Sequence, residues 1–167
     1  HTLASLTASQ ADAIRRIPPH DAAPVPAIEA TRPAAMFTDP LLFERERRLL
    51  HRRLPVPVTL SAMVPEAGSV IATEGYGIPL LVMRGRDGIA RVFLNACQHK
   101  GARVVEHCDP MKANLVTCPY HAWSYATDGR LAGVARSETF ANLDRSQRNL
   151  AELPSREAGG LVWAILD

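Results

Sequence analysis

The chain has 167 residues, of which 47% are hydrophobic, and a formal net charge of +2. This length predicts one domain with enough apolar material for a core, and the small net charge gives no reason to expect a nucleic-acid partner. The longest apolar runs, such as residues 78–83, are far too short to cross a bilayer, so we expect no membrane association.

The setting expected for the chain is cytoplasmic. Residues 1–10 lack the basic region and long apolar stretch of a secretory signal. Three cysteines, an odd number, argue against a disulfide framework and for a reducing compartment. The chain starts at His1 and stops at Asp167 directly after an expected strand, so we expect a piece of a longer protein.

Residues 1–38 are rich in alanine, threonine and proline. Five prolines between positions 17 and 33 oppose regular structure. We therefore expect an extended arm here, with one short helix over residues 9–16.

A helix is expected over residues 39–54. Asp39 can cap it, and Pro40 suits its first position. Leu42 and Leu49 fall on one face, and Pro55 ends the helix. Its arginine-rich face is interpreted as solvated rather than as a docking surface.

Residues 55–167 carry strand signals. Two β-rich runs, 78–84 and 89–95, flank a turn sequence at 85–88 and predict a hairpin. Further strands are expected over 115–117, 122–126 and 160–167, with a turn at 128–129. Short strands at close spacing predict an all-β fold, either a sandwich or a small barrel.

One stretch, residues 97–123, holds all three cysteines and three of the six histidines. Cys97 and His99 form one pair, and Cys118 and His121 form a second pair with two residues between them. Each pair follows an expected strand, so two loops at one tip of the fold can face each other with four ligands between them.

Two thiolates and two imidazoles suit zinc, and they also suit an iron–sulfur cluster in which histidines replace two cysteines. The single spacer between Cys97 and His99 is shorter than zinc hooks usually have, which favours the cluster. His107 and Cys108 lie between the pairs and are interpreted as a surface imidazole and a free thiol. Lys100 could steer an acidic redox partner or be an ordinary exposed charge; both alternatives stay open.

The motifs CQHKGAR (97–103) and CPYHAW (118–123) resemble the Rieske 2Fe–2S motif. More narrowly, the chain resembles the N-terminal Rieske domain of the oxygenase (alpha) subunit of ring-hydroxylating-type non-haem iron oxygenases. The blocks LNACQHKGARV, TCPYHAWSY, TDGRL and GGLVWAILD match that family in the right order, so the resemblance covers about residues 39–167.

The resemblance implies an all-β Rieske domain of small antiparallel sheets with the cluster loops at one tip, preceded by a helix. The implied division is an arm (1–38), a helix (39–54) and the Rieske domain (55–167), with the C-terminal catalytic domain absent. It implies a 2Fe–2S cluster with Cys97 and Cys118 on one iron, and His99 and His121 on the other. Lys100, Gly101, Pro119 and Trp123 match positions that shape the loops, Trp123 as an apolar wall.

The chain departs from the Rieske proteins of respiratory complexes. Ala102 and Tyr120 stand where those proteins carry an additional disulfide, and Trp123 stands where they carry a serine that donates to a sulfide. Fewer donors predict a potential in the lower part of the range of about −150 to +300 mV. Tyr125 matches a hydrogen-bonding tyrosine there, but we assign it no bond to the cluster. Ala122 replaces a usual glycine.

The implied function is one-electron transfer to a mononuclear iron that performs O2-dependent hydroxylation or demethylation. The full-length protein would be an oxidoreductase, a mono- or dioxygenase, whereas this chain contains no catalytic residues, and the mononuclear Fe(II) is expected only in the missing catalytic domain. Expected partners are a reductase or ferredoxin donor and the protein's own catalytic domain, in a neighbouring subunit of a homo-oligomer. The substrate stays open. The alternatives are a stand-alone Rieske ferredoxin and a zinc-binding structural module.

Overall fold

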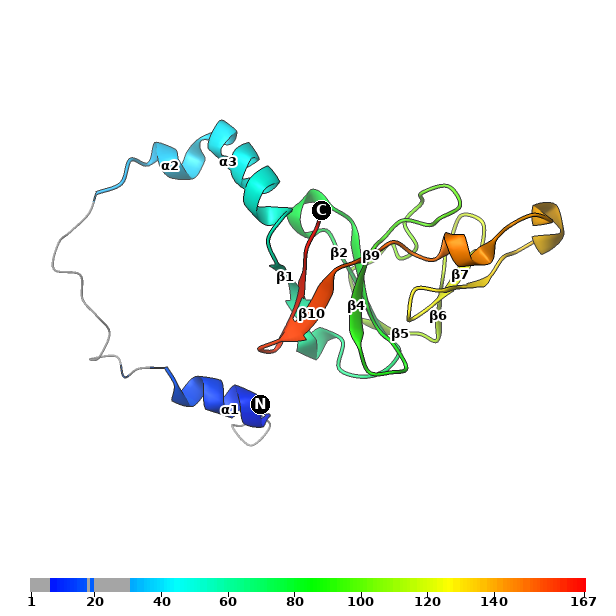
Figure 1. Ribbon diagram of the computed structural model, residues 1–167, viewed down its shortest axis with the longest axis horizontal. Coiled ribbons are helices and arrows are strands. Elements are labelled where there is room, and N and C mark those ends of the chain that lie inside the picture. The colour runs from blue at the N-terminus through cyan, green and yellow to red at the C-terminus, as the bar shows by residue number, and fades with distance from the viewer. Residues whose placement is uncertain (1–6, 18, 20–30) are drawn as a thin grey trace. The chain divides into compact units, whose positions relative to one another are not determined.

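The computed structural model describes residues 7–17, 19 and 31–167, and the chain falls into two compact units, residues 1–46 and 47–167. The first unit contains the helices α1 (Ala8–Arg15), α2 (Ala35–Thr38) and α3 (Pro40–Glu46), which Figure 1 shows in blue and cyan. The short helix expected over residues 9–16 is thus confirmed as α1. Of the extended arm expected over residues 1–38, residues 1–6, 18 and 20–30 lie outside the described residues, and α2 shows that its end is helical rather than extended.

The helix expected over residues 39–54 begins as predicted. Asp39 accepts a hydrogen bond from the backbone N–H of Leu41 through Oδ1 (2.8 Å), and Pro40 is the first residue of α3. A π-helical segment, η3 (Arg47–His51), follows directly, so helical structure ends three residues before Leu54. No residue of α3 or η3 is buried. Within the described residues, every helix is too short or too polar to span a membrane.

The second unit is built from three antiparallel sheets, which confirms the all-β prediction (Figure 1). The first has the order β1 (Val56–Leu60), β11 (Leu161–Ala164), β10 (Ser155–Ala158). The second has the order β5 (Met111–Lys112), β2 (Ser69–Thr73), β3 (Leu80–Arg84), β4 (Ala90–Leu94), β9 (Glu152–Leu153). The third has the order β6 (Leu115–Thr117), β7 (Ser124–Ala126), β8 (Leu131–Gly133).

The five-stranded sheet is the middle layer because it is apolar on both faces. In β3, Leu80 and Val82 pack into a core with Val162 of the first sheet. Their neighbours Leu81 and Met83 point to the opposite face and pack into a second core with the third sheet. Side chains alternate along a strand, so a continuous apolar run fills both cores at once.

The predicted hairpin is confirmed, with slightly shorter strands. β3 and β4 pair from Leu80↔Leu94 to Arg84↔Ala90 around the turn that begins at Gly85. The strand expected over 115–117 is β6, and those expected over 122–126 and 160–167 are confirmed in part as β7 and β11. At the turn between β7 and β8, a Cβ on Gly129 would lie 2.3 Å from the Phe93 ring, so only glycine fits.

Candidate metal centre

The first loop of the site is a tight turn that leaves β4. The backbone N–H of Cys97 donates to the carbonyl of Ala102 (2.8 Å), and the N–H of Gly101 donates to the carbonyl of Cys97 (2.8 Å). Gly101 has φ +75°, a left-handed conformation that glycine adopts at little cost. These bonds turn the chain back on itself around Cys97.

Asn95 closes the base of this loop from a buried position. Its Nδ2 donates to the carbonyl of Val105 (2.7 Å), while its Oδ1 accepts from the backbone N–H groups of Val104 (2.9 Å) and Val105 (3.2 Å). One side chain therefore satisfies three buried backbone groups and ties the two ends of the loop together.

The second loop has the same backbone frame. The N–H of Cys118 donates to the carbonyl of Trp123 (2.8 Å), and the N–H of Ala122 donates to the carbonyl of Cys118 (3.0 Å). Ala122 has φ +54°, so the residue four positions after the cysteine is left-handed in both loops. An alanine in this conformation costs about 1–2 kcal/mol, which shows that the loop geometry overrides the local preference.

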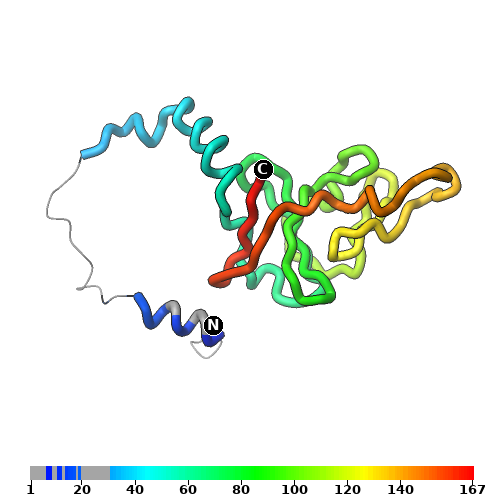
Figure 2. The backbone as a smooth tube through the Cα atoms, viewed as in Figure 1, coloured from blue at the N-terminus to red at the C-terminus, as the bar shows by residue number. Residues whose placement is uncertain are grey.

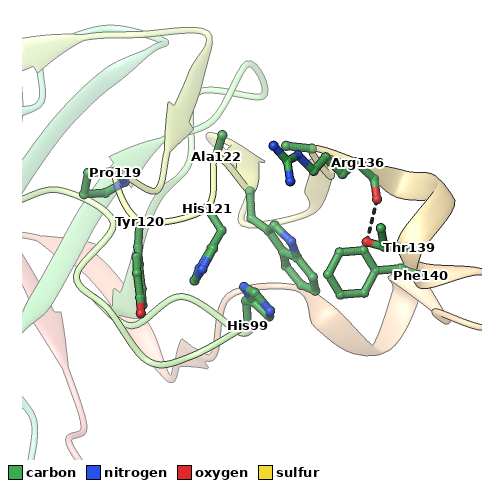
Figure 3. A pocket seen from close by; sticks show the side chains of 10 residues that line it. His99, Pro119, Tyr120, His121, Ala122, Arg136, Thr139 and Phe140 are labelled. Carbon is green, nitrogen blue, oxygen red and sulfur yellow. Dashed lines mark hydrogen bonds between the residues drawn. The ribbon is translucent and has the colours of Figure 1, made fainter.

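The two loops bring the four predicted ligands together as two like pairs. Cys97 and Cys118 are unpaired by any disulfide, only 3% and 2% exposed, and close enough to interact electrostatically. The rings of His99 and His121 meet edge to face with centroids 4.6 Å apart, nearer the surface (Figure 3). No three His, Cys, Asp or Glu side chains among the described residues are grouped as for a single ion.

These side chains fit a metal cluster chemically. Burial, and to a smaller extent the neighbouring Cys118, raises the pKa of the Cys97 thiol, so a thiolate here needs a metal to offset its charge. Nδ1 of His99 is buried without a hydrogen-bond partner in the described structure, as expected for an atom reserved for a metal. Desolvation lowers the pKa of His99, which favours the neutral imidazole that metals bind.

Tyr125 contributes a hydroxyl to the thiol pair. Its oxygen accepts from the backbone N–H of Gln98 (3.0 Å) and lies 3.3 Å from Sγ of Cys97. Burial raises the pKa of Tyr125, so the hydroxyl keeps its proton and can donate it toward the sulfur. The sequence gives no basis for assigning a bond to Tyr125, whereas the folded chain places its hydroxyl beside the Cys97 sulfur.

Aromatic rings surround the histidine pair. Trp123, the expected apolar wall, is buried and stacks on His99 at 4.9 Å with the planes 8° apart. Tyr120 lies 3.8 Å from His121, and Phe140 lies edge-on to His99 at 5.6 Å. A hollow of about 550 Å³ opens beside these rings, between the second loop and residues 135–140 (Figure 3).

The comparison with protein families identifies the domain. Residues 55–145 match the profile described as "Rieske [2Fe-2S] domain". The chain belongs to the Rieske family. The members of this family hold a 2Fe–2S cluster, which agrees with the paired thiols and imidazoles described above.

Relatives of this Rieske domain are oxygenase subunits. The carnitine monooxygenase oxygenase subunit of Escherichia coli (strain K12) is 33% identical over 137 residues, which cover 82% of this chain and 36% of the relative. The anthranilate 1,2-dioxygenase large subunit of Acinetobacter baylyi is 32% identical over 133 residues, covering 79% and 28%. The chain therefore spans about a third of the length of the curated relatives it matches.

Solved structures of Rieske oxygenases are also similar to this chain. A quaternary ammonium Rieske monooxygenase in complex with L-carnitine superposes with a TM-score of 0.72 and 28% identity, covering 82% of this chain and 39% of that one. Naphthalene 1,2-dioxygenase from Rhodococcus sp. gives a TM-score of 0.73 and 29% identity, covering 81% and 31%.

Four other polar residues near the two loops take no part in the Cys/His pairs. His107 and Cys108 are exposed, as expected for passengers in the intervening loop. Arg103 forms an ion pair with Glu74, and Lys100 is exposed. The sequence alone did not reveal Asn95 or Phe140, because their contacts with the loops arise only from the folded chain.

Proposed function

We propose that this chain transfers one electron at a time through a Rieske 2Fe–2S cluster, as the electron-accepting domain of a Rieske non-haem iron oxygenase. The main support is the separation of the ligand types: the thiols pair in the core and the imidazoles pair at the surface. A mixed cluster needs this arrangement, because one iron takes both cysteines and the other takes both histidines.

In this proposal Cys97 and Cys118 hold one iron, and His99 and His121 hold the other. When bound, the cluster supplies a one-electron carrier whose potential exceeds that of an all-cysteine cluster. Trp123 excludes water behind His99, and the Tyr125 hydroxyl stabilises added negative charge at the Cys97 sulfur. The exposed His121 gives electrons a short route to the surface.

The electron donor and the electron acceptor of the cluster lie outside this chain in our proposal. The curated relatives carry most of their length outside the matched region, and one solved relative is described as revealing inter-subunit electron transfer. We propose a reductase or ferredoxin as donor, and as acceptor a mononuclear iron in the catalytic domain of a neighbouring subunit. Removing that iron from the full-length protein should stop oxygenation while the donor still reduces the cluster.

The cluster is tested by spectroscopy and analysis of the purified protein. We expect visible absorption, iron and inorganic sulfide in equal amounts, and a low-temperature EPR signal after reduction with dithionite. A colourless, EPR-silent protein with stoichiometric zinc would show a structural zinc module instead.

The ligand assignment is tested by His121→Cys, with His107→Cys as the matched control. Replacing a neutral imidazole by a thiolate adds negative charge, so His121→Cys should keep a coloured cluster with a lower midpoint potential. His107 lies exposed in the same stretch, and its variant should keep the wild-type potential. An unchanged potential in His121→Cys would contradict the role of His121.

A further inference from the structure

Three aromatic rings from separate segments, those of His99, Trp123 and Phe140, contact one another. Trp123 lies parallel to the imidazole, and Phe140 lies edge-on to both, at 5.6 Å and 87° from His99 and at 5.6 Å and 80° from Trp123. Edge-to-face pairs at such distances are attractive. Phe140 therefore contacts both the imidazole and the indole against which the imidazole lies.

Phe140 is held in place by a turn of its own. Residues 134–149 leave the third sheet between β8 and β9 and extend away from it (yellow to orange in Figure 2). The carbonyl of Arg136 accepts from both the N–H (2.9 Å) and the Oγ1 (2.8 Å) of Thr139, which winds the short helix η6 (Ser137–Phe140). Phe140 and Leu143 then pack against the core that contains both cysteines.

The two histidines consequently have unequal surroundings. His99 is half-buried, with Trp123 on one face and Phe140 at its edge, whereas His121 is exposed beside Tyr120, itself 65% exposed. Phe140 and His99 line the same hollow (Figure 3). Without the phenyl ring, this hollow would be wider and would expose more of the His99 imidazole.

We propose that Phe140 is a positioning residue for His99: its ring packs beside the stacked imidazole and indole, limits the movement of the imidazole, and shields that edge of the cluster from water. The inference rests on the proposed function, in which His99 is a ligand. Groups just outside the ligands fix ligand orientation and solvent access, and both affect the stability and electronic state of a metal centre.

The test is Phe140→Ala in the purified protein with its cluster. A freer imidazole should broaden the EPR signal of the reduced cluster. Water beside His99 favours the more negatively charged reduced state, so the midpoint potential should rise. A chelator should remove iron from the oxidised protein about tenfold faster than from wild type.

Two controls separate positioning from general stability. Phe140→Tyr keeps the ring and should retain the wild-type EPR signal and iron-release rate. Leu143→Ala removes an apolar side chain from the same segment and the same core. It should lower the melting temperature and leave the EPR signal, the midpoint potential and the iron-release rate unchanged.

The outcomes distinguish this inference from the proposed function. A wild-type protein without a cluster overturns the proposed function and, with it, this inference. A normal wild-type cluster combined with wild-type behaviour of Phe140→Ala, or with equal changes in Leu143→Ala, overturns the positioning role alone. If Phe140→Ala does not fold, Phe140→Leu makes the same comparison, because it removes the aromatic ring and keeps most of the apolar volume.

Discussion

The two cluster loops share one backbone frame and are supported in different ways. The second loop is a hairpin loop between β6 and β7, closed by the pair Thr117↔Ser124 and by their hydroxyl groups 2.9 Å apart. The first loop leaves β4 without a paired returning strand, and Asn95 bonds to Val104 and Val105 instead. A single amide side chain thus performs the task that strand pairing performs in the other loop.

The loops also differ in what reaches them from outside. The Tyr125 hydroxyl approaches the sulfur of the first loop, and the first loop has a glycine where the second has Ala122. The shared frame therefore positions the four predicted ligands, and we expect the unequal supports to affect the stability and the potential. Changing one support at a time separates these contributions.

Asn95→Leu should have the largest effect. The leucine has a similar volume but leaves three buried backbone groups of Val104 and Val105 without partners, at about 1–3 kcal/mol each. We expect the free energy of unfolding to fall by about 4 kcal/mol or more, and the iron content to fall with it. Urea unfolding and iron analysis measure both quantities.

The matched variant in the second loop is Ser124→Ala. It removes the exposed hydroxyl bonds to Thr117 Oγ1 (2.9 Å) and to the Ala122 carbonyl (3.4 Å) where strand pairing remains, so its cost should stay below about 1 kcal/mol. Equal losses in Asn95→Leu and Ser124→Ala would show that the loops do not depend on different supports.

Tyr125→Phe should separate potential from stability. It removes the donor to Cys97 Sγ and the acceptor of the Gln98 N–H, at about 1–1.5 kcal/mol. If most of this energy favours the reduced state, the one-electron midpoint potential should fall by about 40–60 mV. Redox titration followed by EPR measures the fall, and a rise would contradict hydrogen-bond donation to the sulfur.

Gly101→Ala gives the first loop the residue that the second loop has at the corresponding position, Ala122. A Cβ at Gly101 has no heavy atom within 4 Å, so the expected cost is conformational alone, about 1 kcal/mol. Thermal unfolding measures it, and the visible spectrum should stay the same. A loss of the cluster would mean that space, and not φ, requires glycine here.

Ala122→Gly should have the smallest effect, with the opposite sign. Glycine relieves the positive φ of Ala122 but also gains freedom in the unfolded chain, so the net gain should be at most about 1 kcal/mol. A slightly higher melting temperature is expected. A clear destabilisation would show that the exposed alanine methyl group makes a stabilising contact.

The sequence predicts the ligand positions better than it predicts what surrounds them. Two short Cys/His spacings and the flanking apolar runs suffice for the loops and for β3 and β4. By contrast, β10 is a mostly exposed edge strand and lacks the apolar alternation that reveals a strand. Asn95 and Phe140 carry no local signal, because their partners lie in other turns of the folded chain.

Tyr125 is another residue whose contact could not be predicted from the sequence. Its place beside the second motif is visible in the sequence, whereas its bond partner belongs to the first loop. Spacing within one motif cannot specify a contact between two motifs. That contact depends on the pairing of β6 with β7 and on the packing of the third sheet against the middle sheet.

The burial of the two cysteines has a consequence for how the protein matures. Cys97 and Cys118 belong to the same apolar core as Val70 and Leu81, the core that joins two of the three sheets. A cluster donor cannot reach thiols that are 2–3% exposed in the packed domain. With these cysteines as ligands, iron and sulfide can reach them only while this core is open, so cofactor assembly requires that the two loops separate, either during folding or by local opening.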